Sequence, residues 1–198
     1  MQGLILKDLY MLKKYCGLML VVVIAFVLYW AAFTDANPFF DFYPTILIGV
    51  LPITLQSYDE MQGWYRYSGG LPYTRAQLVL VKYLMGLFLT TFVCVVKAAA
   101  SFALRDGVDL TSVVTAWAMG LVPSAVFMPF AFKFGAEKAR LFMLFGIGAT
   151  SAVSLSFLSF NGTSVIETNI AAIVVCGAIV LYALSYFIAS ALFKKRDL

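Results

Sequence analysis

Long apolar segments separated by short polar ones form the dominant pattern of the chain. Six apolar segments are each long enough, at about 20 residues, to cross the hydrocarbon core of a membrane as a helix. They cover residues 15–33, 39–57, 78–104, 110–132, 141–160 and 170–193. The polar intervals between them are too short for an ordinary folded domain of about 50 residues or more. We therefore predict an all-α membrane protein with six transmembrane helices, in a single transmembrane domain over residues 1–198.

The composition supports a membrane protein and narrows its function. Apolar residues make up 63% of the chain and charged residues 12%, against about half and a quarter in soluble domains. Histidine is absent, which removes the imidazole base of most hydrolytic triads and the usual zinc ligands of intramembrane metalloproteases. Cys16, Cys94 and Cys176 lie in separate apolar segments without C-x-x-C spacing, so we expect small buried packing residues. The sequence predicts no catalytic, cofactor-binding or metal site in this chain.

Basic residues collect on one side of the six-helix topology. Cytoplasmic flanks of membrane helices are enriched in Lys and Arg. Twelve of the 14 basic residues fall in the terminal segments and the two loops on one side, and the other side has only Arg105. No basic residues gather on a soluble face, so we expect no nucleic-acid partner. We predict that both termini face the cytoplasm.

Residues 1–14 have the pattern of an amphipathic helix that lies at the membrane surface. At 100° per residue, Ile5, Leu9 and Leu12 share a face, and Lys7 lies opposite. A helix of this kind lies along the plane of the inner leaflet. Two interpretations stay open: an elbow helix braced against a cytoplasmic partner, or a plain membrane anchor.

The cytoplasmic loop at residues 57–77 contains two helix-start signals. Ser57 with Glu60, and Thr74 with Gln77, fit the capping box, in which side chains satisfy free N–H groups of a first helical turn. The spacing predicts one short helix after Ser57 and another that opens after Thr74 and becomes the third span.

The short helix is expected over residues 58–68, ending at the Gly-Gly pair that follows. Its spacing places Glu60, Trp64 and Tyr67 along one side. Aromatic residues are enriched where protein partners concentrate their binding energy, so we interpret this segment as a docking helix. The alternative is that its aromatic residues belong to the interfacial belt of the membrane.

Lys97 is the one basic residue that lies well inside an apolar segment away from the cytoplasmic flanks. An ionisable side chain within a membrane is a candidate functional group, which would line the translocation path or pair with an acidic group. Lys97 is also near enough to the outer end of segment 78–104 for its long stem to reach the outer headgroups. Both interpretations stay open.

The order of several short motifs resembles that of a known family, the small permease subunits of bacterial ABC exporters of type two. The motifs are Leu6-Lys7-Asp8-Leu9, Asp59-Glu60, Gly63-Trp64, Tyr67, Leu71-Pro72, Arg75 and Lys82-Tyr83. The second cytoplasmic loop, residues 133–140, is similar to the corresponding loop of that family through Gly135, Glu137, Lys138 and Arg140. The resemblance spans the chain and includes its six-span topology.

The resemblance implies a homodimeric permease in a bacterial cytoplasmic membrane, joined to two copies of a separately encoded ABC ATPase. ATP and Mg are then expected on that ATPase, and this chain has no GxxxxGK[ST] phosphate-binding loop. The 57–77 loop would be the coupling helix that contacts the ATPase, through Asp59, Glu60, Trp64, Tyr67, Leu71, Pro72 and Arg75. Some relatives in the family export amphipathic peptide toxins, including phenol-soluble modulins. The expected substrate is therefore hydrophobic or amphipathic, and a peptide is favoured.

Two other functions stay open on the sequence. An ion-coupled secondary carrier needs an intramembrane acidic group and a charge relay, and Lys97 has no evident acidic companion in the apolar segments. A non-transporting membrane scaffold or immunity protein needs only a partner surface.

Overall fold

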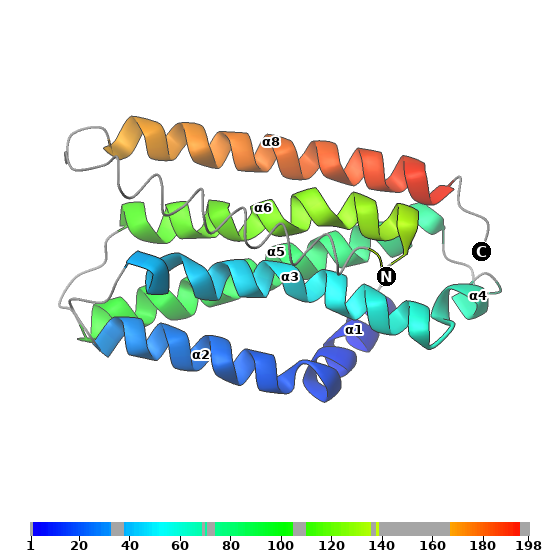
Figure 1. Ribbon diagram of the computed structural model, residues 1–198, viewed down its shortest axis with the longest axis horizontal. Helices are drawn as coiled ribbons and strands as arrows, with labels where there is room; N and C mark the ends of the chain where they lie inside the picture. Colours follow the sequence, from blue (N-terminus) through cyan, green and yellow to red (C-terminus); the bar gives the residue numbers. More distant parts are fainter. Residues whose placement is uncertain are drawn as a thin grey trace.

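The computed structural model describes residues 2–32, 38–68, 70, 74–104, 110–135, 138 and 167–194. Within these ranges all regular structure is helical, which confirms the all-α prediction there. The helices are α1 (Gln2–Tyr15), α2 (Gly17–Ala32), α3 (Pro38–Met61), α4 (Trp64–Ser68), α5 (Arg75–Leu104), α6 (Leu110–Phe134) and α8 (Glu167–Lys194). The long helices run along a common axis, and α4 lies at the same end of the bundle as the C-terminal end of α8 (Figure 1).

Three predicted spans correspond to helices that are long and apolar enough to cross a membrane. Among the described residues these are Arg75–Ala103, Ser112–Phe134 and Ala172–Lys194. A fourth span results if α1 and α2 are counted together, although they are bent by 77°. The helix α3 covers the predicted segment 39–57 and extends it to Met61. The predicted span 141–160 lies outside the described residues, so the total of six spans stays a prediction.

The bend between α1 and α2 sets α1 across the end of the bundle rather than along it (Figure 1). The side of α1 that faces the bundle carries Leu4, Asp8, Met11 and Leu12, all of which are buried. Leu9, which we placed on the apolar face with Leu12, is 37% exposed. The apolar face predicted for residues 1–14 is therefore only partly the face that contacts the rest of the protein.

The helix start predicted at Ser57 is wrong. α3 continues through Ser57 to Met61, and Ser57 is buried within it. The capping signal has no effect there because the N–H groups that a cap would satisfy already have partners in the preceding helical turn. The chain turns instead at Gly63, whose φ of 68° favours glycine. α4 then ends at Ser68, as expected from the Gly-Gly pair.

The second predicted helix start is confirmed in both of its hydrogen bonds. The backbone N–H of Gln77 donates to Thr74 Oγ1 at 3.3 Å, and the N–H of Thr74 donates to Gln77 Oε1 at 3.0 Å. This reciprocal pair is the capping box. α5 begins at Arg75 and continues without interruption into the third span.

α3 and α6 cross at very close range. A Cβ on Gly49 would overlap the carbonyl oxygen of Gly120, and a Cβ on Gly120 would lie 2.6 Å from Cγ2 of Thr45. Small residues permit this approach, which supplies van der Waals contact where lipid gives no hydrophobic drive between helices.

Hydroxyl groups join α5, α6 and α8 inside the bundle. Ser185 of α8 donates to the carbonyl oxygen of Ala125 at 2.5 Å, and its Oγ lies 2.6 Å from the hydroxyl of Tyr83 in α5. Tyr182 donates to the carbonyl oxygen of Tyr83 at 2.6 Å. These bonds satisfy polar groups that would otherwise be buried without partners.

The expectation for the cysteines holds at two positions and fails at the third. Cys16 and Cys94 are buried, whereas Cys176 is exposed. Cys176 lies on a side of α8 that also exposes Ile173 and Val180. An apolar residue satisfies a lipid-facing position as well as a protein-facing one, so hydropathy alone does not distinguish the two sides of α8.

Candidate functional site

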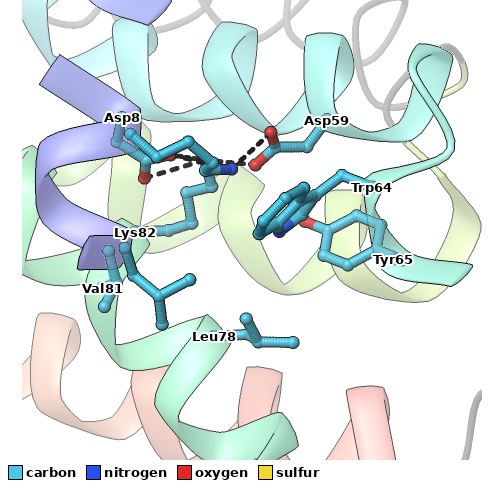
Figure 2. A pocket seen from close by; sticks show the side chains of 9 residues that line it. Asp8, Asp59, Trp64, Tyr65, Leu78, Val81 and Lys82 are labelled. Atoms are coloured by element: carbon cyan, nitrogen blue, oxygen red, sulfur yellow. Dashed lines mark hydrogen bonds and ion pairs between the residues drawn. The ribbon is translucent and has the colours of Figure 1, made fainter. Parts of the chain in front are cut away.

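Four charged side chains from three helices meet at the end of the bundle where α4 lies. We call Lys7, Asp8, Asp59 and Lys82 the charge cluster. The Lys82 ammonium lies 2.9 Å from both carboxylate oxygens of Asp8 and 2.7 Å from Oδ2 of Asp59. The Lys7 ammonium donates to Oδ1 of Asp59 at 2.6 Å and lies 3.2 Å from Oδ1 of Asp8. Figure 2 shows the carboxylates of Asp8 and Asp59 facing each other, with dashed lines that mark their ion pairs between them.

The charge cluster is almost completely shielded from solvent. The exposed fractions of the Asp8, Asp59 and Lys82 side chains are 1%, 2% and 4%, and that of Lys7 is 22%. An isolated buried charge is costly, and pairing with good geometry offsets that cost. The two cations and two carboxylates of the cluster balance to zero net charge. If one member moves away, the others are left with an unbalanced buried charge, so the cluster favours an arrangement in which all four stay together.

Three of the four members, Asp8, Asp59 and Lys82, occupy positions in an apolar stripe of their helices. Asp8 follows the buried Leu4 by four residues on α1, and Lys82 follows the buried Leu78 by four residues on α5. Asp59 lies in the last turn of α3, four residues after the buried Leu55. The same packing that buries these leucines carries the charged side chains inward. The cluster consequently ties the ends of α1, α3 and α5 to one another.

Aromatic side chains connect the charge cluster to α4. The Lys7 ammonium lies 4.3 Å from the centroid of the Trp64 ring, a cation–π contact. Trp64 in turn contacts Tyr67, with ring centroids 5.6 Å apart. Tyr65 packs edge-on against Phe193 near the end of α8 at 5.3 Å. α4 is thus held on one side by the cluster and on the other by α8.

The predicted ATPase-contacting residues divide into a buried and an exposed group. Asp59 is in the charge cluster, Trp64 is half-buried over Lys7, and Glu60 is half-buried. Tyr67 in α4 is 66% exposed, and so is Met61, six residues earlier at the end of α3. The exposed group therefore lies on α4 and at the end of α3.

Arg75 is exposed at the start of α5 and reaches the end of α8. Its guanidinium donates to the carbonyl oxygens of Lys194 at 3.0 Å and Phe193 at 3.5 Å. A cation suits this position because the last carbonyl groups of a helix lack partners and form the negative end of its dipole. Leu71 and Pro72 lie outside the described residues.

The loop predicted as the second cytoplasmic loop, residues 133–140, is described only in part. Gly135 ends α6 with a φ of 88°, and its N–H donates to the carbonyl oxygen of Ala131 at 3.1 Å. Lys138 is exposed, and Glu137 and Arg140 lie outside the described residues.

Lys97 is buried within the bundle, far from α4. Its ammonium lies 3.4 Å from Oγ of Ser112, in the first turn of α6. The side chain therefore extends toward the end of α5 that leads to α6, which is the direction expected for a stem that reaches the outer headgroups. Its burial agrees equally with a polar contact inside the protein.

The pairing of Asp8 with Lys82 was not predicted from the sequence. Both residues occur in the motifs Leu6-Lys7-Asp8-Leu9 and Lys82-Tyr83, but they are 74 positions apart. A signal was present in each helix separately, because both residues are charged at positions where the helical period calls for an apolar side chain. Which charges pair with which depends on how the helices pack.

Comparison with known proteins gives one match. The family described as ABC-2 family transporter protein matches residues 3–194. This range contains the whole charge cluster, α4 and Lys97. No curated protein and no solved structure matches the chain.

Proposed function

The chain belongs to the ABC-2 family of transporter proteins, and from that membership we propose that it is the permease subunit of an ATP-driven exporter. The family implies an ABC ATPase as partner, and in our proposal that ATPase is a separate chain that binds ATP and Mg. The observation that carries the proposal is the family match over residues 3–194. The arrangement of α4 and the charge cluster adds a route by which the ATPase would act on the membrane helices.

The ATPase contacts the permease at α4 and the end of α3. Tyr67 and Met61 are the exposed apolar side chains there, and each is 66% exposed. Tyrosine is a residue type in which interfaces concentrate binding energy, and it has little conformational entropy to lose. Trp64 is turned inward over Lys7. We assign Trp64 the role of holding α4 against the charge cluster through this contact.

The charge cluster transmits a displacement of α4 to the membrane helices. Trp64 contacts Lys7, and the Lys7 ammonium donates a hydrogen bond to Oδ1 of Asp59 in α3 at 2.6 Å. Asp8 of α1 and Asp59 of α3 both form ion pairs with Lys82 of α5. Because separating these charges leaves some of them buried without a partner, the three helix ends move together. Movement of the ATPase then becomes a rigid-body rotation of the helices between inward-open and outward-open states.

The α4 end of the bundle faces the cytoplasm of a bacterium in this proposal. Lys13, Lys14, Lys133 and Lys194 all occur in the last turns of helices α1, α6 and α8. Arg75 and the end of α8 are bonded to each other, so they lie at one end. Concentration of Lys and Arg at one end supports a cytoplasmic position for it.

Two copies of this chain form the translocation path between them, and two ATPase subunits bind the dimer. The described helices expose mainly apolar side chains, among them Phe92, Val95 and Phe187. Walls of this kind favour a hydrophobic or amphipathic substrate over a sugar or an ion. We propose an amphipathic peptide as the substrate.

Transport by the reconstituted complex tests the proposal. The permease and its ATPase are placed in proteoliposomes, and accumulation of a fluorescent amphipathic helical peptide is followed with and without ATP. ATP-dependent accumulation is expected, and an ATPase with its Walker lysine replaced is the control. Peptide accumulation without ATP would support the ion-coupled carrier instead. If the chain neither transports the peptide nor binds the ATPase, the result would support the non-transporting scaffold or immunity protein.

A pair of tyrosines tests the docking surface directly. Tyr67 of α4 and Tyr10 of α1 are almost equally exposed, at 66% and 68%. Tyr67→Ala is expected to weaken ATPase binding by about 2 kcal/mol, the scale of an interface hot spot. Tyr10→Ala is the matched control and is expected to leave binding unchanged. Trp64→Ala combined with Tyr67→Ala is expected to release the ATPase in detergent, and full retention of the complex would contradict the assignment.

A further inference from the structure

An apolar groove lies between α1 and α5, next to the charge cluster. Its volume is about 420 Å³. The residues that line it include Ile5, Leu9, Leu84, Leu87, Phe88 and Thr91. Leu9, Leu84, Leu87 and Phe88 are all exposed, so the groove is open along its length.

The groove follows the exposed side of α5 from the level of α1 toward the middle of that helix. Its α5 wall begins at Leu84, two residues beyond Lys82, and ends at Thr91. At a rise of about 1.5 Å per residue, this wall is about 10 Å long. Ile5 and Leu9 of α1 form the opposite wall. The groove is therefore shaped for a thin extended chain that lies parallel to α5.

The groove contains no free hydrogen-bonding group among its described lining residues. Thr91 supplies the one hydroxyl, which donates to the carbonyl oxygen of Leu87 at 2.7 Å. The same hydroxyl accepts a bond from Nε1 of Trp117 at 3.1 Å. A peptide in the groove would leave its own N–H and C=O groups without partners, at considerable cost. A hydrocarbon chain carries no such groups.

Two lysines follow the α1 wall of the groove in the chain. Lys13 follows Leu9 by four residues, so it lies on the same face of α1 as the groove wall. Lys14 is its neighbour in the last turn of α1, and both are exposed. The carboxylates of Asp8 and Asp59 are buried in the charge cluster and bonded to their own cations. The exposed charge one helical turn beyond Leu9 is therefore positive, which is complementary to a phosphate group.

We propose that the groove binds an anionic phospholipid of the cytoplasmic leaflet. One acyl chain lies between α1 and α5 along Leu84–Thr91, and the phosphate lies at Lys13. The assignment of the leaflet rests on the orientation given under the proposed function. A bound lipid fills the space between α1 and α5 beside the charge cluster, so it stabilises the contact through which α1 joins the other helices.

Fluorescence quenching by brominated lipids tests the proposal. Trp117 is bonded to Thr91 at the far end of the groove, so a brominated acyl chain in the groove lies within quenching range. The permease alone, with Trp30→Phe and Trp64→Phe, is placed in equal mixtures of phosphatidylglycerol and phosphatidylcholine, with one of the two brominated. We expect about a fivefold preference for phosphatidylglycerol, the effect of one lysine near an anionic lipid.

Lysine variants separate the groove from general surface charge. Lys13→Gln is expected to abolish the preference. Lys133→Gln, an exposed lysine in the last turn of α6, is the matched control and is expected to retain it. Equal quenching by both lipids, or an equal effect of the two variants, would overturn the proposal. Weak quenching by both lipids would mean that another segment or a second copy covers the groove, which also overturns it.

A second measurement avoids the tryptophan substitutions. Native mass spectrometry of the otherwise unchanged permease, released from nanodiscs of the same mixture, is expected to show bound phosphatidylglycerol that is lost in Lys13→Gln. Retention of the lipid by Lys13→Gln contradicts the site. Both experiments use the permease without ATP or the ATPase. A failure here leaves the transport proposal standing, and a failure of ATPase coupling leaves lipid binding unaffected.

Discussion

Replacement of Lys82 by methionine removes the cation that holds two carboxylates together. Its ammonium lies 2.9 Å from Asp8 and 2.7 Å from Asp59, and all three side chains are almost fully buried. Methionine fills nearly the same volume with an unbranched apolar chain. The substitution therefore changes the charge while it disturbs the packing little. Lys7 is left as the one described cation within bonding distance of two buried carboxylates.

The expected loss of stability is about 3–5 kcal/mol, the typical effect of removing one partner from a buried ion pair. Two unit charges about 4 Å apart attract by about 4 kcal/mol at an effective dielectric constant of about 20, which is the same scale. A loss of this size corresponds to a fall of about 10 °C in the melting temperature of a chain of this length. Repulsion between Asp8 and Asp59 adds to the loss.

A second substitution shows whether charge is the cause. Asp8→Asn in the Lys82→Met background leaves Lys7 paired with Asp59 at 2.6 Å and restores charge balance. We expect the double variant to recover more than half of the lost stability. Lys133→Met is the matched control, because this lysine is exposed at the end of α6. Its effect is expected to stay within about 0.5 kcal/mol.

Thermal unfolding in detergent, followed by the loss of monodisperse protein, measures all four proteins side by side. The reasoning is refuted if Lys82→Met melts with the wild type, since the cluster then contributes nothing to holding the helices together. It is also refuted if the double variant is no more stable than Lys82→Met alone. In that case the lost stability comes from packing around residue 82 and not from unpaired charge.

Three further substitutions test other parts of the structure. Gly49→Val forces α3 away from Gly120, and we expect a loss of at least about 1–3 kcal/mol in a detergent melt; unchanged stability would contradict the close crossing. Thr74→Ala removes the bond to Gln77 and is expected to cost about 1 kcal/mol in the same assay. Lys97→Met is expected to impair peptide export in proteoliposomes while membrane insertion, measured by fractionation, stays normal. Unchanged export would assign Lys97 to the outer headgroups.

Local signals predicted elements well where the partner atoms are close in the sequence. The capping box of Thr74 and Gln77 joins groups three residues apart, and both of its bonds form. The same motif at Ser57 fails because the apolar stretch before it already continues the helix to Met61. A cap acts only where a helix begins, and whether one begins there depends on the residues that precede it.

The sequence predicted which segment forms the candidate site. It did not predict which side chains of that segment are buried and which are exposed. The resemblance predicted contact residues at Asp59, Trp64 and Tyr67, and these lie in the last turn of α3 and in α4, which follows it in the chain. Their solvent exposure differs, because Asp59 is buried in the charge cluster while Tyr67 is exposed. Helical spacing places residues on one side of a helix, but which side faces the protein depends on the neighbouring helices.

The sequence by itself determined that this chain is helical and embedded in a membrane, since segment length and apolar content are properties of each segment alone. It also determined where α5 begins and where α4 ends. The tertiary structure alone decided that Asp8, Asp59 and Lys82 meet, because these residues come from three helices and pair only once the helices are packed. It likewise decided which apolar faces turn inward, because lipid and protein interior accept the same side chains. Hydropathy does not distinguish them, and close helix packing does.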